Sequence, residues 1–380
     1  MKNHSLTTPA RNWTDPSVYV EEICVEASCA EHAYTQEIID RASLPVTVIA
    51  DHECKDIVAG EYPDNLTAGK KVLLLCRNNG EFLKDCPGTK AYRCCGYRVI
   101  NIGMGCPMDC VYCILQAYLN NPYLSFFVNT DELFSELTVK IDAYDGPVMR
   151  IGTGEFTDSM ALDRITGLSR PLVEFFAGRK DGILELKTKS AYVESLRDLD
   201  HNGRTIMAWS LNGASVAGRD EIRAATLDQR LHAAAQCAQW GYRLAFHFDP
   251  IIAYPDCERE YREIIEKLFN TVPADRIAWI SIGALRYIPS LKQIGTSRFP
   301  HSPIYYQEFI EGMDGKQRYF RDMRVKLYKA IYNELKPRSA ARTCIYFCME
   351  SDEIWQEVMG FTPEAYGGIP AMLDRSVAPS

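Results

Sequence analysis

Short apolar runs alternate with amphipathic stretches along most of the chain, which is the pattern of strands and helices in turn. Two buried-strand patterns come early, at residues 44–50 and 71–76, and a helical pattern precedes the first at residues 35–42. From about residue 99 onward the alternation becomes regular. It predicts strands at residues 148–154, 183–189, 205–212, 243–251, 276–285 and 341–349, and helices at residues 171–178, 227–240, 258–269 and 320–335.

Repeated strand–helix units predict an α/β fold with a parallel sheet, because a parallel connection needs a crossover. We expect the sheet to curl into a partial (β/α) barrel. The expected domains are an N-terminal α/β extension with a cysteine-rich lead-in (residues 1–98), the barrel (99–310) and a C-terminal extension of helix and strand that completes the barrel edge (311–380). In such barrels the chemistry lies at the carboxyl ends of the strands.

Composition and charge narrow the cellular context. The 380 residues are 47% hydrophobic, the N-terminus has no apolar leader, and no run approaches the roughly 20 apolar residues of a spanning helix. We therefore expect a cytoplasmic protein with no membrane partner. Because the net charge is −8, nucleic acid could be bound only through a local basic face.

Fourteen cysteines in such a chain indicate free thiols that bind metal rather than disulfides. Three of them, Cys106, Cys110 and Cys113, have the spacing C-x3-C-x2-C. Three thiolates can bind three irons of a cubane and leave the fourth iron open. Zinc, which usually takes four closed ligands with C-x2-C pairs, fits less well. Coincidence in a cysteine-rich chain is the other alternative.

An aromatic residue, Tyr112, precedes the third cysteine, and this pattern resembles the radical S-adenosylmethionine (SAM) superfamily. The segment GCPMDCVYCILQAYLNNPYLSFFVNTDEL resembles the cluster loop of the spore photoproduct lyases, which are radical SAM enzymes of DNA repair. The similarity runs from about residue 99 to 350 and includes TKSAYVESLRDLDHNGRTIMAWSLN and LRYIPSLKQIGTSRFP. The segments CPGTKAYRCCGY and CIYFCMES resemble a branch called the spore photoproduct lyase-like family.

The resemblance implies a lyase or transferase with a [4Fe–4S] cluster on the three cysteines, SAM at the open iron, and a reductant such as flavodoxin or ferredoxin. Reductive cleavage of SAM would generate a 5′-deoxyadenosyl radical, with the hard chemistry carried by the cofactors. The residues that would contact SAM are Gly152, Gly154, Glu155, Lys189, Ser210 and Asn212. The glycines would admit the ligand to the backbone, Glu155 would accept from the ammonium, Lys189 would face the carboxylate, and the last two would approach the ribose. The alternative is a turn with satisfied polar residues at strand ends.

Two positions depart from the lyase pattern. The lyases have a hydrogen-donating cysteine where this chain has Glu155, and a tyrosine where it has Ile114, although Tyr112 is kept as a catalytic candidate. A carboxyl group cannot replace a thiol as hydrogen-atom donor, because its O–H bond is far stronger than S–H. We therefore expect radical chemistry on an unidentified, non-DNA substrate. The alternatives are lyase-like DNA repair or nucleic-acid modification with an altered donor, and a non-catalytic metal-binding protein.

A thiol elsewhere in the chain is a candidate for the hydrogen-atom donor. Cys348 is predicted at the end of the last strand, where side chains face the barrel mouth, and the alternative is an inert buried thiol. Strand ends also make four polar residues candidate substrate contacts, against the alternative of a hydrogen-bonded rim. These four are His247, Asp249, Arg286 and Glu350.

Two further features stay open. Cys86, Cys94 and Cys95 could ligate a second cluster or could be small buried side chains. The segment KQRYFRDMRVKLYK, residues 316–329, carries six basic residues. On one helix Arg318, Arg321, Arg324 and Lys329 would share an arc of roughly 140°. That face could contact phosphates, and a merely solvated face is the alternative.

Overall fold

The computed structural model of the chain describes residues 13–54, 57–89 and 92–378. Its centre is an eight-stranded sheet with the strand order β18-β14-β13-β11-β10-β9-β5-β4. Every pairing from β18 to β5 is parallel, and only β4 joins antiparallel. These strands are β4 (Leu83–Asp85), β5 (Arg98–Ile100), β9 (Met149–Gly152), β10 (Gly182–Thr188), β11 (Thr205–Ser210), β13 (Arg243–Ile251), β14 (Ile277–Ala284) and β18 (Cys344–Phe347).

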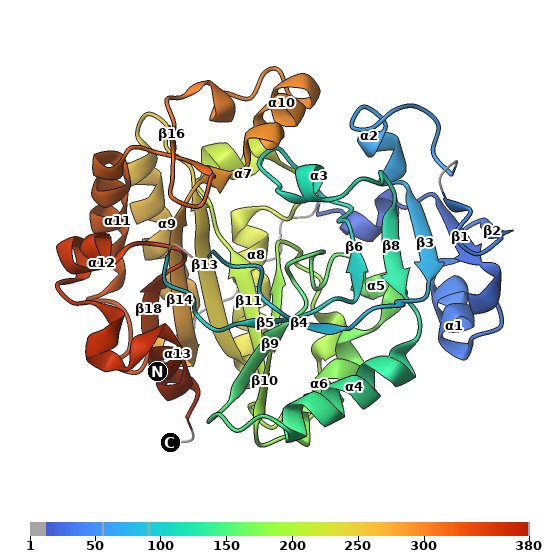
Figure 1. Cartoon of the computed structure of the whole chain (residues 1–380). Coiled ribbons are helices and arrows are strands. Elements are labelled where there is room, and N and C mark those ends of the chain that lie inside the picture. Colours follow the sequence, from blue (N-terminus) through green and yellow to red (C-terminus); the bar gives the residue numbers. More distant parts are fainter. Residues whose placement is uncertain (1–12, 55–56, 90–91, 379–380) are drawn as a thin grey trace.

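This sheet curls into a half-barrel with helices on its outer side (Figure 1). Helix α6 packs on β10 and β11, α8 on β11 and β13, and α13 on β14 and β18. Because both faces are covered, β11 and β14 are buried at every position. The outer helices are α4 (Thr130–Asp142), α6 (Ser169–Ala177), α8 (Leu227–Gln239), α9 (Cys257–Thr271), α11 (Arg321–Leu335), α12 (Asp352–Met359) and α13 (Gly368–Val377). The predicted α/β half-barrel is confirmed.

The N-terminal strands belong to a second sheet of five strands, in the order β2-β1-β3-β8-β6. Its first four strands pair in parallel, and β6 joins β8 antiparallel. The strands are β1 (Glu22–Glu26), β2 (Val46–Ile49), β3 (Val72–Cys76), β6 (Gly103–Met104) and β8 (Leu124–Phe127). Helix α1 (Ala33–Ala42) packs against α5 (Asp163–Thr166), which lies after β9. The segment that joins β6 to β8 contains the three motif cysteines, so this sheet supports their loop from one side.

The last strand is shorter than its sequence pattern predicts. Strand β18 ends at Phe347, although the Cys348 amide still donates to the Ile282 carbonyl at 3.0 Å. Met349 then takes the left-handed conformation with φ 56°, which ends the extended run. Cys348 therefore stands at the turn that follows the strand.

The basic residues of segment 316–329 do not form one helix face. Arg318 lies in β17 (Gln317–Arg318) of a small antiparallel sheet, and α11 begins only at Arg321. The other strands of that sheet are β15 (Arg286–Tyr287) and β16 (Ile310–Glu311). Arg318 and Arg324 are buried and paired with carboxylates, at 2.7 Å from Asp314 and 3.0 Å from Glu350. These charges stabilise the fold and are not offered to a partner. Among the described helices, none is long and apolar enough to cross a membrane.

Candidate active site

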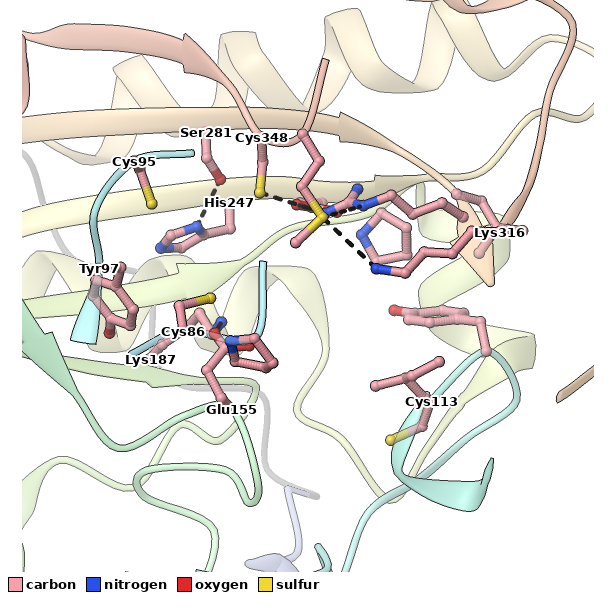
Figure 2. Close-up of a pocket in the computed structure, with 18 of the residues that line it drawn as sticks. Cys86, Cys95, Tyr97, Cys113, Glu155, Lys187, His247, Ser281, Lys316 and Cys348 are labelled. Carbon is pink, nitrogen blue, oxygen red and sulfur yellow. Dashed lines mark hydrogen bonds and ion pairs between the residues drawn. The ribbon is translucent and has the colours of Figure 1, made fainter. Parts of the chain in front are cut away.

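A cavity of about 300 Å³ lies within the half-barrel, near the carboxyl ends of its strands (Figure 2). Strand β10 contributes Glu185 and Lys187 to its wall, and β13 contributes His247 and Asp249. One end is formed by the cysteine loop with Tyr112 and Cys113, and the opposite wall carries Cys348. The cavity is thus bounded by the two features that the sequence singled out, the cysteine motif and a separate thiol.

The cysteine loop runs from β6 to α3 (Leu115–Tyr118), and hydrogen bonds from neighbouring groups to its backbone hold it in place. Its short strand β7 (Asp109–Cys110) pairs antiparallel with β12 (Glu221–Ile222). The Gln116 side chain donates to the carbonyls of Cys110 and Val111, each at 3.1 Å. The Tyr305 hydroxyl donates to the Val111 carbonyl at 3.0 Å. These bonds hold the loop carbonyls, so the cysteine side chains are left free for ligation.

A buried charge cluster anchors the same loop. Asp109 lies 3.0 Å from the Lys70 ammonium and 2.8 Å from the Arg298 guanidinium, and all three side chains are buried. Burial alone would raise the pKa of Asp109, but the two cations bring this pKa below its ordinary value. The carboxylate therefore stays charged and ties α2 (Leu66–Gly69) and α10 (Pro289–Arg298), through their cations, to the loop.

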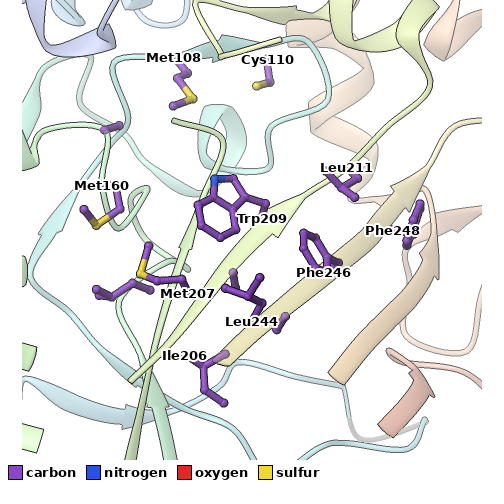
Figure 3. Close-up of a cluster of buried hydrophobic side chains, with 14 of the residues drawn as sticks. Met108, Cys110, Met160, Ile206, Met207, Trp209, Leu211, Leu244, Phe246 and Phe248 are labelled. Carbon is purple, nitrogen blue, oxygen red and sulfur yellow. The ribbon is translucent and has the colours of Figure 1, made fainter. Parts of the chain in front are cut away.

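The loop cysteines offer a donor set of thiols only, which is the set that iron–sulfur clusters use. Cys106 and Cys113 line one small cavity of about 20 Å³, and Cys113 also lines the main cavity. Cys110 is buried beside Met108 at the edge of an apolar cluster beneath the loop (Figure 3). Among the described residues, no three His, Cys, Asp or Glu side chains already form a metal-binding group. The fit to a cluster therefore rests on the donor chemistry and on the shared cavities.

Tyr112 and Lys189 lie together behind the loop. The Tyr112 hydroxyl donates to Glu221, which is paired at 2.5 Å with the buried Arg230. The Lys189 ammonium lies 5.7 Å from the centre of the Tyr112 ring. Lys189, which was predicted to face the SAM carboxylate, thus lies next to the cysteine motif.

Three other predicted SAM contacts are Gly152, Asn212 and Ser210, and the first two have roles in the packing of the fold. A Cβ at position 152 would lie 1.6 Å from the Tyr97 hydroxyl, so Gly152 is required for the packing of Tyr97. The Asn212 side chain is already satisfied, because it accepts from Tyr261 at 2.6 Å and donates to the Pro250 carbonyl at 3.0 Å. Ser210 is buried on β11, and its carbonyl accepts from Arg230 at 2.8 Å.

Glu155 follows β9 and lines the main cavity. Its carboxylate pairs with the Lys187 ammonium at 2.5 Å. Burial alone would lower the pKa of Lys187, but Glu155 and Glu185 raise it above its ordinary value. Gly154, just before Glu155, packs against β10, where a Cβ would lie 3.0 Å from the Lys187 carbonyl oxygen. Glu155 is therefore a charged, paired group on the cavity wall.

A hydrogen-bonded row crosses the floor of the cavity. Ser281 and His247 Nδ1 are 2.6 Å apart, and His247 Nε2 lies 2.8 Å from Glu185 Oε1. Trp279 Nε1 also donates to Glu185 Oε1, at 2.9 Å. Burial alone would raise the pKa of Glu185, but His247, Lys187 and Tyr97 lower it to about 2. His247, a predicted substrate contact, is thus held in one orientation.

The remaining wall carries Asp249, Arg286 and Cys348. Two parallel contacts of 3.0 Å join the Arg286 guanidinium to the Asp249 carboxylate, and Arg286 Nη2 lies 3.4 Å from Cys348 Sγ. Burial raises the pKa of the Cys348 thiol to about 12, although Arg286 opposes this shift. Cys348 is therefore a protonated thiol at neutral pH. Three of the predicted pocket residues, Asp249, Arg286 and Cys348, lie in direct contact.

Glu350 does not reach the cavity. It is buried behind the wall, where Oε1 accepts from Arg324 at 3.0 Å and from the Tyr328 hydroxyl at 2.6 Å. Sequence reasoning also missed Glu185 and Lys187, which line the cavity. The sequence contains a signal for both residues. They are two charged residues, two positions apart in the apolar strand ILELKTK, so they must face the same side of the sheet.

A family model described as spore photoproduct lyase matches residues 19–351. The chain belongs to the spore photoproduct lyase family. It is therefore a radical SAM enzyme of the lyase type, in a family whose members use a [4Fe–4S] cluster and SAM.

Curated members of the spore photoproduct lyase family are distant in sequence. The spore photoproduct lyase of Geobacillus sp. (strain Y412MC61) is 26% identical over 247 residues, which cover 64% of this chain and 70% of that protein. The spore photoproduct lyase of Bacillus subtilis (strain 168) is 27% identical over 238 residues, covering 62% and 68%.

Solved structures of spore photoproduct lyase show the same fold. A variant with bound AdoMet and dinucleoside spore photoproduct has a TM-score of 0.77 at 21% identity, covering 86% of this chain and 98% of that chain. A complex with dinucleoside spore photoproduct gives 0.76 over the same shares. The comparisons give no support to the expectation of a non-DNA substrate.

Proposed function

We propose that this protein opens a covalently linked dinucleoside of the spore photoproduct type, and that the Cys348 thiol returns the hydrogen atom. The family supports the reaction type, and the solved structures with dinucleoside spore photoproduct support the substrate class. The expectation of a non-DNA substrate rested on the missing thiol at position 155. A thiol on another wall of the same cavity removes that objection.

The observation that carries the proposal is the position of Cys348. Cys348 and Cys113 line the same cavity, one on the far wall and the other on the cysteine loop (Figure 2). A substrate radical formed near the loop would therefore have a thiol on its other side. Because Cys348 stays protonated, its S–H bond is available at neutral pH.

Cys106, Cys110 and Cys113 would hold the cluster, and Lys189 with Glu155 would bind the carboxylate and ammonium of SAM. When bound, cluster and SAM supply the organic radical that starts the reaction. The loop network keeps the cysteines in place, and an apolar cluster lies beneath the loop (Figure 3).

The hydrogen return at Cys348 breaks one bond, forms another and leaves the thiol oxidised by one electron. The Sγ–H bond of Cys348 breaks and a C–H bond forms on the substrate, leaving a thiyl radical on Sγ. One electron from an external reductant and one proton then restore the thiol. Arg286, 3.4 Å from Sγ, fixes the thiol toward the cavity.

The charges of the cavity suit two uncharged bases that are covalently linked. Glu155 is paired with Lys187, Glu185 with His247, and Asp249 with Arg286. Each carboxylate therefore has a hydrogen-bonding partner in the wall, so the part of the cavity that these residues line can take an uncharged group. The amide and carbonyl edges of nucleobases match such donors and acceptors.

The test is turnover of a synthetic dinucleoside spore photoproduct by the anaerobically reconstituted protein, with SAM and dithionite. We expect SAM cleavage and release of thymidine, both detected by mass spectrometry. The variant with Cys106, Cys110 and Cys113 all changed to Ala should do neither. SAM cleavage without any opening of the dinucleoside would overturn the proposed substrate, and SAM cleavage by the triple variant would overturn the cluster assignment.

A further inference from the structure

Lys316 is a cavity residue whose ammonium lacks a matched partner. It lies in the turn between β16 and β17, and its side chain is only 15% exposed. Its nearest carboxylate oxygen, Asp314 Oδ2, is 4.0 Å away, and its other polar contact is the Met349 sulfur at 3.9 Å. Among the described residues, no oxygen lies within hydrogen-bond distance of this ammonium.

Asp314 is already committed to another cation. Arg318 contacts it twice, with Nη2 2.7 Å from Oδ2 and Nε 3.2 Å from Oδ1. The carboxylate is buried by this pairing, so it cannot turn to Lys316 without breaking the stronger contact. Lys316 is thus left without a close carboxylate partner, because Asp314 pairs with Arg318.

A second cation stands close to Lys316. Arg286 Nε lies 3.3 Å from the Met349 sulfur, so both side chains bracket one thioether. Thioether sulfur is a weak acceptor, and a largely buried ammonium beside another cation is costly without an anion. In agreement with this, burial and then Arg286 lower the pKa of Lys316.

The other charged groups of the cavity wall have closer partners than Lys316. The three carboxylates of its wall, Glu155, Glu185 and Asp249, each have a partner. Lys316 has only a long contact of 4.0 Å with Asp314, which lies outside the lining of the cavity and is held more closely by Arg318. An anionic group on the ligand would give the Lys316 ammonium the close partner that it lacks.

We propose that Lys316, assisted by Arg286, is the subsite for the phosphate that joins the two nucleosides of the lesion in a nucleic-acid strand. This inference rests on the proposed function and extends it, because it assigns the anionic part of the substrate to named side chains. It also assigns an orientation: the phosphate lies toward the β16–β17 turn, and the two bases lie over Glu185 and His247.

Direct binding tests this subsite without turnover. Isothermal titration of the reconstituted full-length protein with SAM, but without reductant, compares the phosphate-linked dinucleotide spore photoproduct with the dinucleoside form. We expect the dinucleotide to bind at least about tenfold more tightly, as charge-assisted hydrogen bonds allow. Lys316→Met should remove most of this preference, whereas Lys316→Arg should keep it. Lys292→Met, on the exposed face of α10, is the matched control and should keep the full preference.

Binding measured at several salt concentrations tests the same phosphate subsite without any variant. The preference of the wild-type protein for the dinucleotide should shrink between low and high ionic strength, because salt screens the contact. Equal wild-type affinities for the two ligands would overturn the subsite while leaving the proposed function intact. Weaker SAM binding by Lys316→Met would also overturn it, because the bound anion would then be the SAM carboxylate. Failure of both lesions to bind would overturn the proposed function itself.

Discussion

At the residue scale, position 155 shows how this chain differs from the lyases that it resembles. The sequence resemblance predicts Glu155 at the place of their hydrogen-donating thiol, and the structure puts its carboxylate on the cavity wall in an ion pair with Lys187. Cys348 lies on the same cavity with its proton retained. The chain can thus keep a thiol donor while using position 155 for charge.

Glu155→Gln tests which ligand the carboxylate serves. The change keeps the size and removes the charge that would pair with the SAM ammonium. A charge-assisted hydrogen bond contributes about 1.5–3 kcal/mol, so the affinity for SAM should fall roughly ten- to a hundredfold. Titration of SAM into wild-type and variant protein measures this. Unchanged SAM affinity combined with slower opening of the dinucleoside would show that Glu155 faces the substrate instead.

Individual residues were predictable from the sequence where a strand end fixes their place. His247, Asp249, Arg286 and Cys348 were expected at strand ends, and all four line the cavity. Glu350 was expected there too, but the left-handed turn at Met349 carries the chain away from the cavity, and nothing in the sequence signals that turn.

At the element scale, the cysteine loop depends on charges that come from distant segments. Lys70 and Arg298 meet at Asp109, although they lie far apart in the sequence. Their convergence is a tertiary property, so the local pattern C-x3-C-x2-C predicts the ligands but not the support of the loop. The β16–β17 turn is a similar case, because its basic residues fit a helix equally well in sequence.

Asp109→Asn tests the loop anchor. The change leaves two buried cations without their anion, which should lower the free energy of unfolding by about 3 kcal/mol. Iron bound per chain after reconstitution should also fall, because the loop loses its fixed position. Denaturant unfolding of the apoprotein and iron analysis measure the two effects, with the exposed Asp131→Asn as control. Iron content and stability equal to those of the control would show that the loop does not depend on Asp109.

At the scale of the whole molecule, alternation of strands and helices was enough to predict the half-barrel. Strand β13 has the predicted bounds, residues 243–251, and β9, β10, β11 and β14 fall within or close to theirs. The second sheet could not be predicted as a whole, because β8 and β6 join strands from the first 80 residues only through tertiary pairing. The charge pairs of the cavity could not be predicted either, because they form only when the strands of the barrel come together.

The Glu185 carboxylate couples this cavity to global stability. Its ordinary pKa of 4.5 falls to about 2 in the fold, so its contribution is fully present above about pH 4.5 and is lost as the pH falls toward 2. Glu185→Gln should therefore lower the free energy of unfolding by about 3 kcal/mol at pH 7. The difference from wild type should shrink between pH 4.5 and 2.

Denaturant unfolding of the apoprotein across this pH range measures the effect, with the exposed Glu266→Gln as a control of unchanged stability. A difference between wild type and Glu185→Gln that stays constant down to pH 2 would show that Glu185 does not titrate with the fold.

The central claim, that a lyase of this family returns hydrogen from Cys348, is tested most directly by turnover in D2O. Thiol hydrogens exchange with solvent, so wild-type protein should place one carbon-bound deuterium in each opened dinucleoside, as mass spectrometry would show. Cys348→Ser should still cleave SAM but stall or divert the product without that deuterium, because a hydroxyl is a far poorer hydrogen-atom donor. Cys95→Ser, which changes another thiol of the same cavity, should behave as wild type. Full product yield with the same deuterium content from Cys348→Ser would contradict the account.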